Sequence, residues 1–272
     1  MTQGHRTAII AGRGALPAAL VAAATERPLV AALDGFGPDG LPPDLTFRLE
    51  RLMPFFGELR ARGITHVVFA GAVARPRGFE AALIDPATAQ VLPALVAAMQ
   101  GGDDATLRAV ITLVEAEGLI VVSPADLAPG LIPGPGILTG TPGPMDHSDA
   151  TRAAKIVAAL GAVDVGQGAV VQQGLCLAVE ALPGTDAMLA QVAMLTLRPD
   201  PAQGRGLLWK APKPGQDRRI DLPTVGPATV AAAAAAGLGG IAFAAGGTIL
   251  LDRPATIAAA ERAGLFLWSR AP

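Results

Sequence analysis

The sequence is poor in cysteine and aromatic residues. It has one cysteine, Cys176, and no tyrosine, and aromatic residues make up 4% of its 272 residues. A single cysteine excludes an intramolecular disulfide and a cysteine-based zinc cluster. Cys176 lies in an apolar run, residues 175–179, which predicts a small buried hydrophobic residue. A chain without disulfides fits a reducing, cytoplasmic setting.

Charge is also scarce. Charged residues make up 16% of the chain, and 21 Lys and Arg against 23 Asp and Glu give a net charge of -2. This composition excludes a disordered chain, because 51% of the residues are hydrophobic. It also argues against a nucleic-acid partner, which requires a positive field.

The mean hydropathy of +0.45 is high for a soluble protein, which raises the question of a membrane-spanning helix. The uncharged stretch over residues 222–251 is long enough for a span. It is opened by two prolines and interrupted by Gly237, Gly239, Gly240, Gly246 and Gly247, so we expect a helix over 228–236, a hairpin about Gly246 and a closing helix. Residues 1–6 are polar and lead directly into a short apolar strand, so we expect no signal peptide of the usual form.

The first half of the chain alternates strands and helices. We expect strands over residues 7–11, 29–33, 66–70 and 119–122, and helices over 16–25, 55–62 and 105–117. Apolar strands that are each followed by a helix indicate a parallel sheet covered on both faces. The prediction is an α/β fold with a Rossmann-like N-terminal domain over residues 1–126.

The composition changes after this domain. Eleven of the twenty-one residues over 124–144 are Gly or Pro, so residues 127–147 are predicted to be a linker. We expect a distinct α+β C-terminal domain over residues 148–272. Its predicted elements are a helix over 150–160, a hairpin of 168–172 and 175–181, a helix from 186 and a strand over 206–210.

Glycines follow the first predicted strand as Gly12-Arg13-Gly14, and Asp34 ends the second predicted strand. Glycines at a helix N-terminus let the backbone approach a phosphate, and a carboxylate about twenty residues later binds ribose in dinucleotide folds. The third glycine of that motif is replaced by Pro17. A tight strand-to-helix turn explains the glycines equally well.

Three further segments are candidates for binding. Asp103 and Asp104 form an acidic pair that either holds a divalent ion or stabilises a helix start. Arg75 follows a predicted strand at the edge where parallel sheets bind ligands. Thr185 and Asp186 either bind a ligand or cap a helix.

The most informative segment is residues 208–226. It contains two of the three lysines of the chain, Lys210 and Lys213, and prolines on both sides of Lys213 stiffen the backbone. Asp221 follows closely. We interpret the segment as an anionic-substrate site in which phosphate meets the cations and Asp221 holds a metal or a water. The alternative is a solvated loop with surface ion pairs.

The order of these segments resembles a known family, the UDP-2,3-diacylglucosamine pyrophosphatases of the LpxI type. The resemblance covers nearly the whole chain, and Arg13 departs from it because a smaller residue is common there. The segments that carry it are Ile10-Ala11-Gly12-Arg13-Gly14-Ala15-Leu16-Pro17, Ala70-Gly71-Ala72-Val73-Ala74-Arg75-Pro76, Gly102-Asp103-Asp104-Ala105-Thr106, Val179-Glu180-Ala181-Leu182-Pro183-Gly184-Thr185-Asp186, Lys210-Ala211-Pro212-Lys213-Pro214 and Arg219-Ile220-Asp221-Leu222-Pro223-Thr224.

The resemblance implies hydrolysis of the diphosphate of UDP-2,3-diacylglucosamine to UMP and 2,3-diacylglucosamine 1-phosphate (lipid X). It implies a magnesium ion, Asp221 as the catalytic residue, and a ligand cleft between the two domains. It also implies a cytoplasmic protein in peripheral contact with the inner membrane. A homodimer is expected from the apolar composition.

These considerations together give the expected site residues. The catalytic ones are Asp221, Lys210 and Lys213; the substrate-binding ones are Gly12, Gly14, Gly71, Ala72, Val73, Arg75, Thr185, Asp186, Ala211, Gln216 and Thr224; the metal ligands are Asp221, Asp103 and Asp104. Two alternatives remain open: an NAD(P)-dependent oxidoreductase and a non-catalytic protein that binds a UDP-sugar or lipid X.

Overall fold

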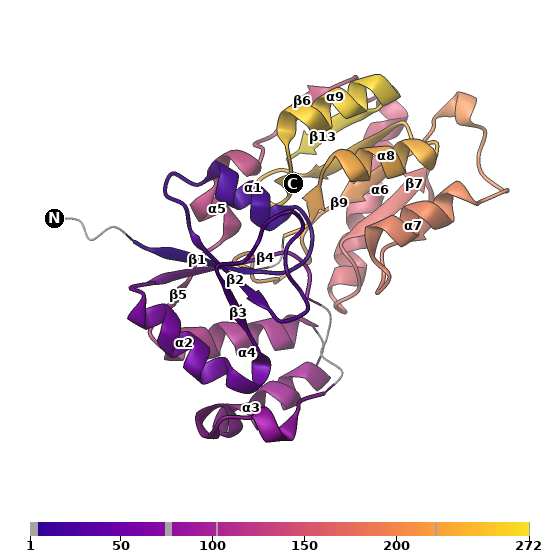
Figure 1. The fold of residues 1–272 in the computed structure, drawn as a ribbon. Coiled ribbons are helices and arrows are strands. Elements are labelled where there is room, and N and C mark those ends of the chain that lie inside the picture. The colour runs from indigo at the N-terminus through magenta and orange to yellow at the C-terminus, as the bar shows by residue number, and fades with distance from the viewer. Residues whose placement is uncertain (1–4, 74–77, 102, 221, 272) are drawn as a thin grey trace. The chain divides into compact units, whose positions relative to one another are not determined.

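The structure is a computed structural model that describes residues 5–73, 78–101, 103–220 and 222–271, without the side chains of residues 103 and 104. The chain forms two compact units (Figure 1). The N-terminal unit comprises Met1–Pro129 and Asp217–Asp221, and the C-terminal unit comprises Gly130–Gln216 and Leu222–Pro272. A short piece of the C-terminal half of the sequence therefore belongs to the N-terminal unit.

A parallel sheet forms the centre of the N-terminal unit. Its strands are β1 (Thr7–Ala11), β2 (Leu29–Leu33), β3 (Leu45–Phe47), β4 (His66–Ala70) and β5 (Ile120–Val121). They lie in the order β3-β2-β1-β4-β5 with parallel pairing throughout. In sheets of this order, ligands bind where the order reverses, at the carboxyl ends of the central strands. The predicted α/β class is confirmed.

Helices cover both faces of this sheet (Figure 1). They are α1 (Leu16–Ala23), α2 (Leu52–Ala61), α3 (Pro86–Gln100), α4 (Asp103–Ala116) and α5 (Pro124–Leu127). One core joins Phe55 of α2, Leu95 of α3 and Val114 of α4 to the sheet. Helices α1 and α5 contact each other on the opposite face. Helix α3 was not predicted, because Pro93 lies inside it and proline argues against a helix interior.

A mixed sheet forms the centre of the C-terminal unit. Its strands are β6 (Gly136–Thr139), β7 (Gly168–Gln172), β8 (Leu175–Val179), β9 (Leu207–Lys210), β11 (Gly240–Ala244) and β13 (Phe266–Arg270). The order is β6-β13-β11-β9-β7-β8, and β13, β11 and β9 run parallel. A separate small sheet pairs β10 (Thr224–Val225) with β12 (Ile249–Leu250).

Four helices pack around this mixed sheet: α6 (Pro144–Gly161), α7 (Gly184–Ala193), α8 (Pro227–Ala235) and α9 (Arg253–Ala263). One core cluster contains Leu189 of α7, Val230 of α8 and Ala260 of α9. The other contains Val157 of α6 together with Trp209 of β9. The sheet therefore has α7, α8 and α9 on one face and α6 on the other.

The hairpin of β7 and β8 is confirmed at the predicted turn. Gln173 and Gly174 both have positive φ, 50° and 76°, as a two-residue hairpin turn of this hand requires. Asp149 of α6 is buried, and its carboxylate accepts the backbone N–H of Gln173 at 2.9 Å and that of Gly174 at 2.7 Å. Cys176 of β8 is exposed, which corrects the prediction of a buried thiol, because β8 is the edge strand of the sheet.

Three other predictions for this half differ from the structure. Strands β11 and β12 lie in different sheets and do not form the predicted hairpin. The chain ends in strand β13 after α9, because Gly264 (φ 63°) ends the helix and releases an apolar run that pairs with β11. Residues 127–147, expected as a linker, carry strand β6 and the start of α6.

Within the described residues, no helix has the length and apolar character that a membrane span requires. The uncharged stretch over residues 222–251 instead folds into β10, α8, β11 and β12.

Candidate functional site

Two loops of the N-terminal unit meet at the carboxyl ends of β1 and β4. Arg13 and Ala72 exchange two backbone hydrogen bonds of 2.9 Å, and the Gly12 amide donates to the Ala70 carbonyl at 2.7 Å. A Cβ at Gly12 would lie 2.6 Å from the Ala72 carbonyl oxygen, and one at Gly71 would lie 2.6 Å from that of Gly12. Both glycines, predicted as ligand contacts, are therefore required by the approach of the two loops.

Gly14 is the glycine of this group that faces open space. Its φ is +98°, and a Cβ there would meet nothing within 4 Å. Helix α1 begins two residues later, and its N-cap residue, Ala15, makes no side-chain cap hydrogen bond. A helix start with unsatisfied amides suits an anion. Val73 follows on the second loop and is 48% exposed, whereas Arg75 lies outside the described residues.

Arg13 and Asp34 are both engaged with neighbouring groups. The Arg13 guanidinium donates to the Gly35 carbonyl at 3.0 Å and lies 5.1 Å from the centre of the Phe36 ring. The Asp34 carboxylate lies 3.6 Å from the Arg48 guanidinium. A cavity beside Asp34 measures about 130 Å³, below the roughly 300 Å³ at which small-molecule sites begin. Asp34 therefore pairs with Arg48, and the cavity beside it is smaller than a typical small-molecule site.

Lys210 is a buried cation at the carboxyl end of β9. Its side chain is 8% exposed, and its ammonium group donates to the Thr185 hydroxyl at 2.7 Å and to the Thr224 carbonyl at 3.5 Å. Thr185 donates to the Glu180 carboxylate at 2.9 Å, and the ammonium group lies 3.8 Å from the same carboxylate. Burial of a charge requires such partners. The structure thus brings together three predicted site residues, Lys210, Thr185 and Thr224. It adds Glu180, which was not predicted.

Thr185 lies in the first turn of α7, at the helix N-terminus. The N-cap residue, Pro183, makes no side-chain cap hydrogen bond. A helix N-terminus carries partial positive charge and unsatisfied amides. The ammonium group of Lys210 and the start of α7 therefore both favour negative charge at Thr185, and the anion that the structure shows there is the Glu180 carboxylate. Phosphate is another anion that helix N-termini bind. Asp186 follows in the same turn and is exposed.

Glu180 is fixed by glycines that sequence reasoning missed. A Cβ at Gly168 would lie 2.7 Å from a Glu180 carboxylate oxygen, and Gly166, with φ +61°, packs against the Glu180 backbone. The Glu180 amide donates to the Gly168 carbonyl at 2.8 Å. The sequence signal was present, because Glu180 stands in one of the segments that carry the family resemblance.

Lys213 lies in a different environment from Lys210. Its ammonium group lies 2.5 Å from the Asp164 carboxylate, and its amide donates to the Gln216 side chain at 2.8 Å. Gly161 at the end of α6 leaves room for this loop, because a Cβ there would lie 2.7 Å from Cδ of Pro214. The two lysines, predicted as a pair, are therefore held by different carboxylates.

The remaining predicted residues of this unit have backbone or loop contacts. The Ala211 amide donates to the Gln167 carbonyl at 3.0 Å, and the Gln167 side chain donates to that of Gln216 at 3.3 Å. Thr224 is half-buried, and its hydroxyl donates to the Leu222 carbonyl at 3.4 Å. These contacts hold the segment after β9 beside the start of β7.

Residues 217–221 belong to the N-terminal unit. Arg219 lies 2.7 Å from the carboxylate of Asp217 and 2.7 Å from that of Glu115 on α4. Hydrogen bonds from Arg219 hold the pKa of Asp217 below its usual range, and the same pairing raises the pKa of Arg219. Asp221 itself lies outside the described residues.

The predicted metal ligands fall outside the described side chains. This applies to Asp221 and to Asp103 and Asp104, of which Asp103 is the first residue of α4. Among the side chains that the structure does describe, no group of three or more His, Cys, Asp or Glu residues is arranged to hold a metal ion.

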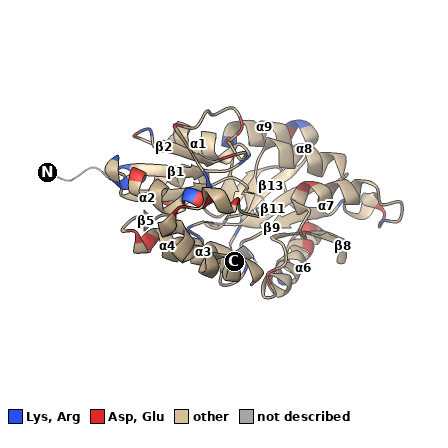
Figure 2. Cartoon of the chain, turned by 60° about the horizontal axis from the view of Figure 1, so that its bottom comes forward, with Lys and Arg blue, Asp and Glu red and all other residues tan. Residues whose placement is uncertain are grey.

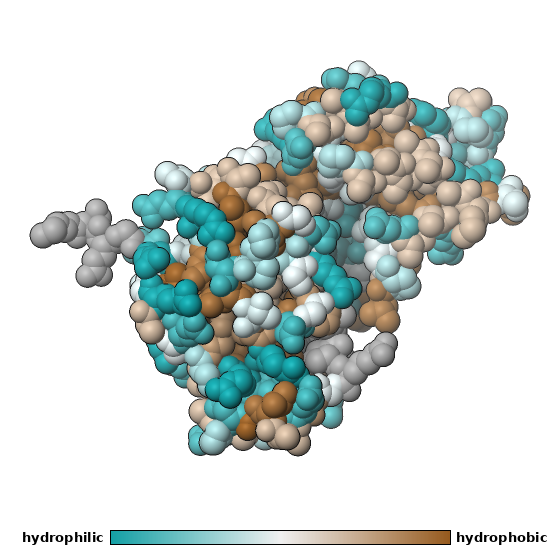
Figure 3. Space-filling model, in the orientation of Figure 1, coloured by the Kyte–Doolittle hydropathy of each residue, from teal (hydrophilic) through white to brown (hydrophobic). Residues whose placement is uncertain are grey.

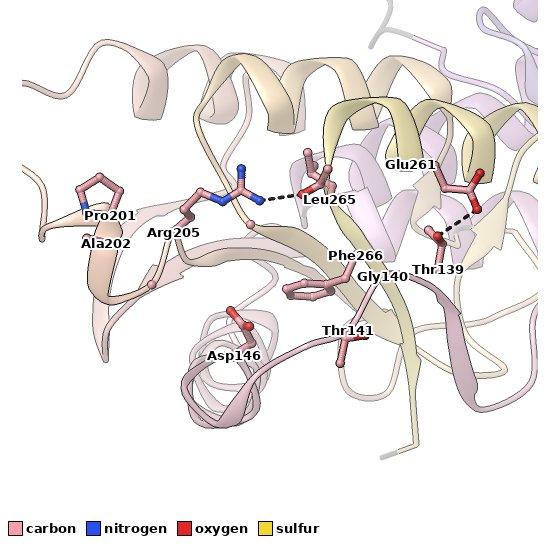
Figure 4. A pocket seen from close by; sticks show the side chains of 13 residues that line it. Thr139, Gly140, Thr141, Asp146, Pro201, Ala202, Arg205, Glu261, Leu265 and Phe266 are labelled. Carbon is pink, nitrogen blue, oxygen red and sulfur yellow. Dashed lines mark hydrogen bonds between the residues drawn. The ribbon is translucent and has the colours of Figure 1, made fainter.

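A larger cavity lies at the amino ends of β9, β11 and β13 in the C-terminal sheet (Figure 4). Its volume is about 580 Å³, and its lining includes Arg205 before β9, Gly239 before β11 and Phe266 at the start of β13. Its charged groups are already engaged: Arg205 donates to the Gly264 carbonyl at 2.6 Å, Glu261 accepts from Thr139 at 3.1 Å, and Asp146 accepts from the Gly143 amide at 2.8 Å. Ligands of parallel sheets bind at the carboxyl ends of strands, where Lys210 lies.

The fold defines a two-domain α/β protein with a buried lysine, Lys210, at the carboxyl end of a parallel strand. Profiles of the LpxI N-terminal domain and the LpxI C-terminal domain match residues 6–131 and 134–268. The UDP-2,3-diacylglucosamine pyrophosphatase LpxI of Caulobacter vibrioides is 41% identical over 274 residues, which cover 97% of this chain and 96% of that protein. The chain belongs to the LpxI family.

Proposed function

We propose that this protein hydrolyses the diphosphate of UDP-2,3-diacylglucosamine to UMP and 2,3-diacylglucosamine 1-phosphate (lipid X), a step of lipid A biosynthesis. The observation that carries the proposal is the 41% identity to a pyrophosphatase of that name over nearly the full length of both chains. A water oxygen bonds to one phosphorus while the bond between that same phosphorus and the bridging oxygen breaks. The bridging oxygen leaves on the other phosphate, and the proton that the water loses is taken up by a base or by solvent. The enzyme's task is to position this water and to neutralise the phosphate oxygens.

The cluster around Lys210 supplies the neutralising charge in this proposal. The ammonium group is fixed by Thr185 and Glu180 at the start of α7. Charge that is already oriented needs no reorganisation when the transition state forms. The neighbouring segments supply further proposed site residues, which are Lys213, Ala211, Gln216 and Asp186. The proposed substrate contacts of the N-terminal unit are Gly12, Gly14, Gly71, Ala72, Val73 and Arg75.

Magnesium is the proposed cofactor. Mg²⁺ at phosphate-transfer sites takes one or two carboxylates, substrate phosphate oxygens and water, so a group of three protein ligands is not required. Asp221 is the proposed ligand, with Asp103 and Asp104 as further candidates. When bound, the ion would withdraw negative charge from the diphosphate oxygens. Asp221 would also orient the attacking water.

The first test is Asp221→Asn. We expect UMP release to fall about 100-fold, as loss of a group that acts on the reacting water does, while substrate binding persists. Release of UMP and lipid X from UDP-2,3-diacylglucosamine is measured with and without Mg²⁺. Asp39→Asn, at an exposed aspartate of the N-terminal unit, is the matched control. Activity of Asp221→Asn within tenfold of wild type would defeat the role assigned to Asp221.

The same assay decides between the proposed enzyme and its alternatives. Turnover by the wild-type protein excludes a carrier that only binds a UDP-sugar or lipid X. Absence of UMP release with Mg²⁺ present would overturn the pyrophosphatase proposal, and specific binding of NADH in a fluorescence titration would then favour an oxidoreductase.

We further propose that the protein contacts the inner membrane from the cytoplasm to collect its diacylated substrate. Large apolar side chains next to α7 support this: Leu182 is 97% exposed, Met194 74% and Leu197 90%. Figure 3 shows a mostly apolar surface over α7 and α8. A homodimer remains an expectation from the apolar composition.

A further inference from the structure

Residues 217–221 belong to the N-terminal unit, although the residues on either side of them in the sequence belong to the C-terminal unit. Gln216 and Leu222 are part of the C-terminal unit, whereas the five residues between them are part of the N-terminal unit. The segment directly precedes and includes Asp221. The contacts of residues 217–220 therefore fix the backbone that directly precedes Asp221 in the sequence.

Arg219 makes the polar contacts of this anchor. Its guanidinium donates to Glu115 at 2.7 Å through Nη1, and to both carboxylate oxygens of Asp217 through Nε and Nη2 at 2.7–3.1 Å. The Arg219 amide also donates to the Asp217 carboxylate at 3.0 Å. Glu115 is 104 positions earlier in the sequence. A planar guanidinium clamped by two carboxylates has a fixed direction, which a lysine would not provide.

Ile220 makes the apolar contact. Its side chain packs against the core of the N-terminal unit, which includes Val114 of α4. Arg219 therefore ties this segment to α4 through Glu115, and Ile220 ties it to the apolar core of the same unit. The contacts of Arg219 and Ile220 therefore hold the two residues that directly precede position 221.

We propose that Arg219, clamped by Asp217 and Glu115, is a positioning residue for the hydrolysis reaction: it holds the backbone that presents Asp221. The inference rests on the proposed function, which gives Asp221 its role. The Lys210 cluster belongs to the C-terminal unit and contains none of these residues. Loss of the anchor therefore lowers the rate of the chemical step and leaves phosphate binding intact.

The experiment compares Glu115→Gln and Arg219→Gln with wild type. We expect kcat to fall about tenfold in both variants, with KM within twofold, and Glu115→Asp to keep kcat within threefold of wild type. The matched control is Glu117→Gln, because Glu117 pairs with Arg60 on α2 near the same end of α4 and does not touch the segment. Its kcat is expected to stay within twofold. Glu115 is 45% exposed, so its substitution tests the anchor without opening the core.

A double-mutant cycle with Asp221→Asn separates the anchor from the proposed function. If Arg219 acts through Asp221, Arg219→Gln has no further effect on kcat in the Asp221→Asn background. An equal tenfold loss in both backgrounds overturns the inference, as does wild-type kcat in both Glu115→Gln and Arg219→Gln. A loss of kcat in Glu117→Gln equal to that in Glu115→Gln also overturns it, because the effect would then be general destabilisation of α4. Full activity of Asp221→Asn instead refutes the role of Asp221 itself.

Discussion

At the residue scale, the most constrained charge of the proposed site is Lys210. Its side chain is 8% exposed and that of Glu180 is 13% exposed, with Thr185 between them. A buried pair of this kind contributes little net stability compared with apolar residues, but removal of one partner leaves an unpaired buried charge. The buried pair is therefore better explained by the anion that we propose it binds than by the stability of the fold.

This argument gives a prediction for Lys210→Met. We expect the free energy of unfolding to fall by about 3 kcal/mol, since Glu180 is left without its cation, and UMP release to be lost. The double variant Lys210→Met/Glu180→Gln is expected to regain most of the stability but none of the activity. Urea unfolding and the UMP assay measure the two effects. Recovery of both properties in the double variant would show that the cluster is structural.

At the element scale, the strands and helices of strong periodicity were predictable and the ones that depend on distant partners were not. Strands β1, β2 and β4 lie at the predicted residues, as does the β7–β8 hairpin. Strand β13 is as long as β1, but it is paired with β11 on one side and with β6 on the other, and local sequence does not reveal these partners. In the same way, the sequence indicated Lys210 and Thr185 but could not pair them across 25 positions.

The β7–β8 hairpin gives the prediction at this scale. Asp149 is 1% exposed and accepts the two turn amides, those of Gln173 and Gly174. Hydrogen bonds to a buried charged acceptor contribute about 2 kcal/mol, so we expect Asp149→Ala to lower the free energy of unfolding by about that amount. Asp149→Asn keeps one acceptor oxygen and is expected to lose about half as much. Urea unfolding measures both, and equal stability of Asp149→Ala and wild type would contradict the capping role.

At the scale of the whole molecule, charge and apolar surface are distributed differently. Figure 2 shows Lys and Arg lying among Asp and Glu rather than on a face of their own, in keeping with the net charge of -2. Apolar exposure is greatest next to α7, at Leu182 and Leu197. A protein of this kind is expected to bind a membrane surface by inserting apolar side chains and not by attraction of anionic lipids, which requires clustered Lys and Arg.

The last prediction therefore concerns membrane contact. Transfer of an exposed leucine into an apolar phase contributes about 2 kcal/mol, so the double variant Leu182→Glu/Leu197→Glu should lower the fraction bound to phosphatidylethanolamine–phosphatidylglycerol vesicles at least about fivefold. Binding by wild type should change little when salt rises from low to high concentration, because salt screens charge and not apolar contact. Val163→Glu is the matched control, since Val163 is 70% exposed but lies beyond the end of α6. Equal loss in the control, or release of the wild type by salt, would show that the surface next to α7 is not what contacts the lipid.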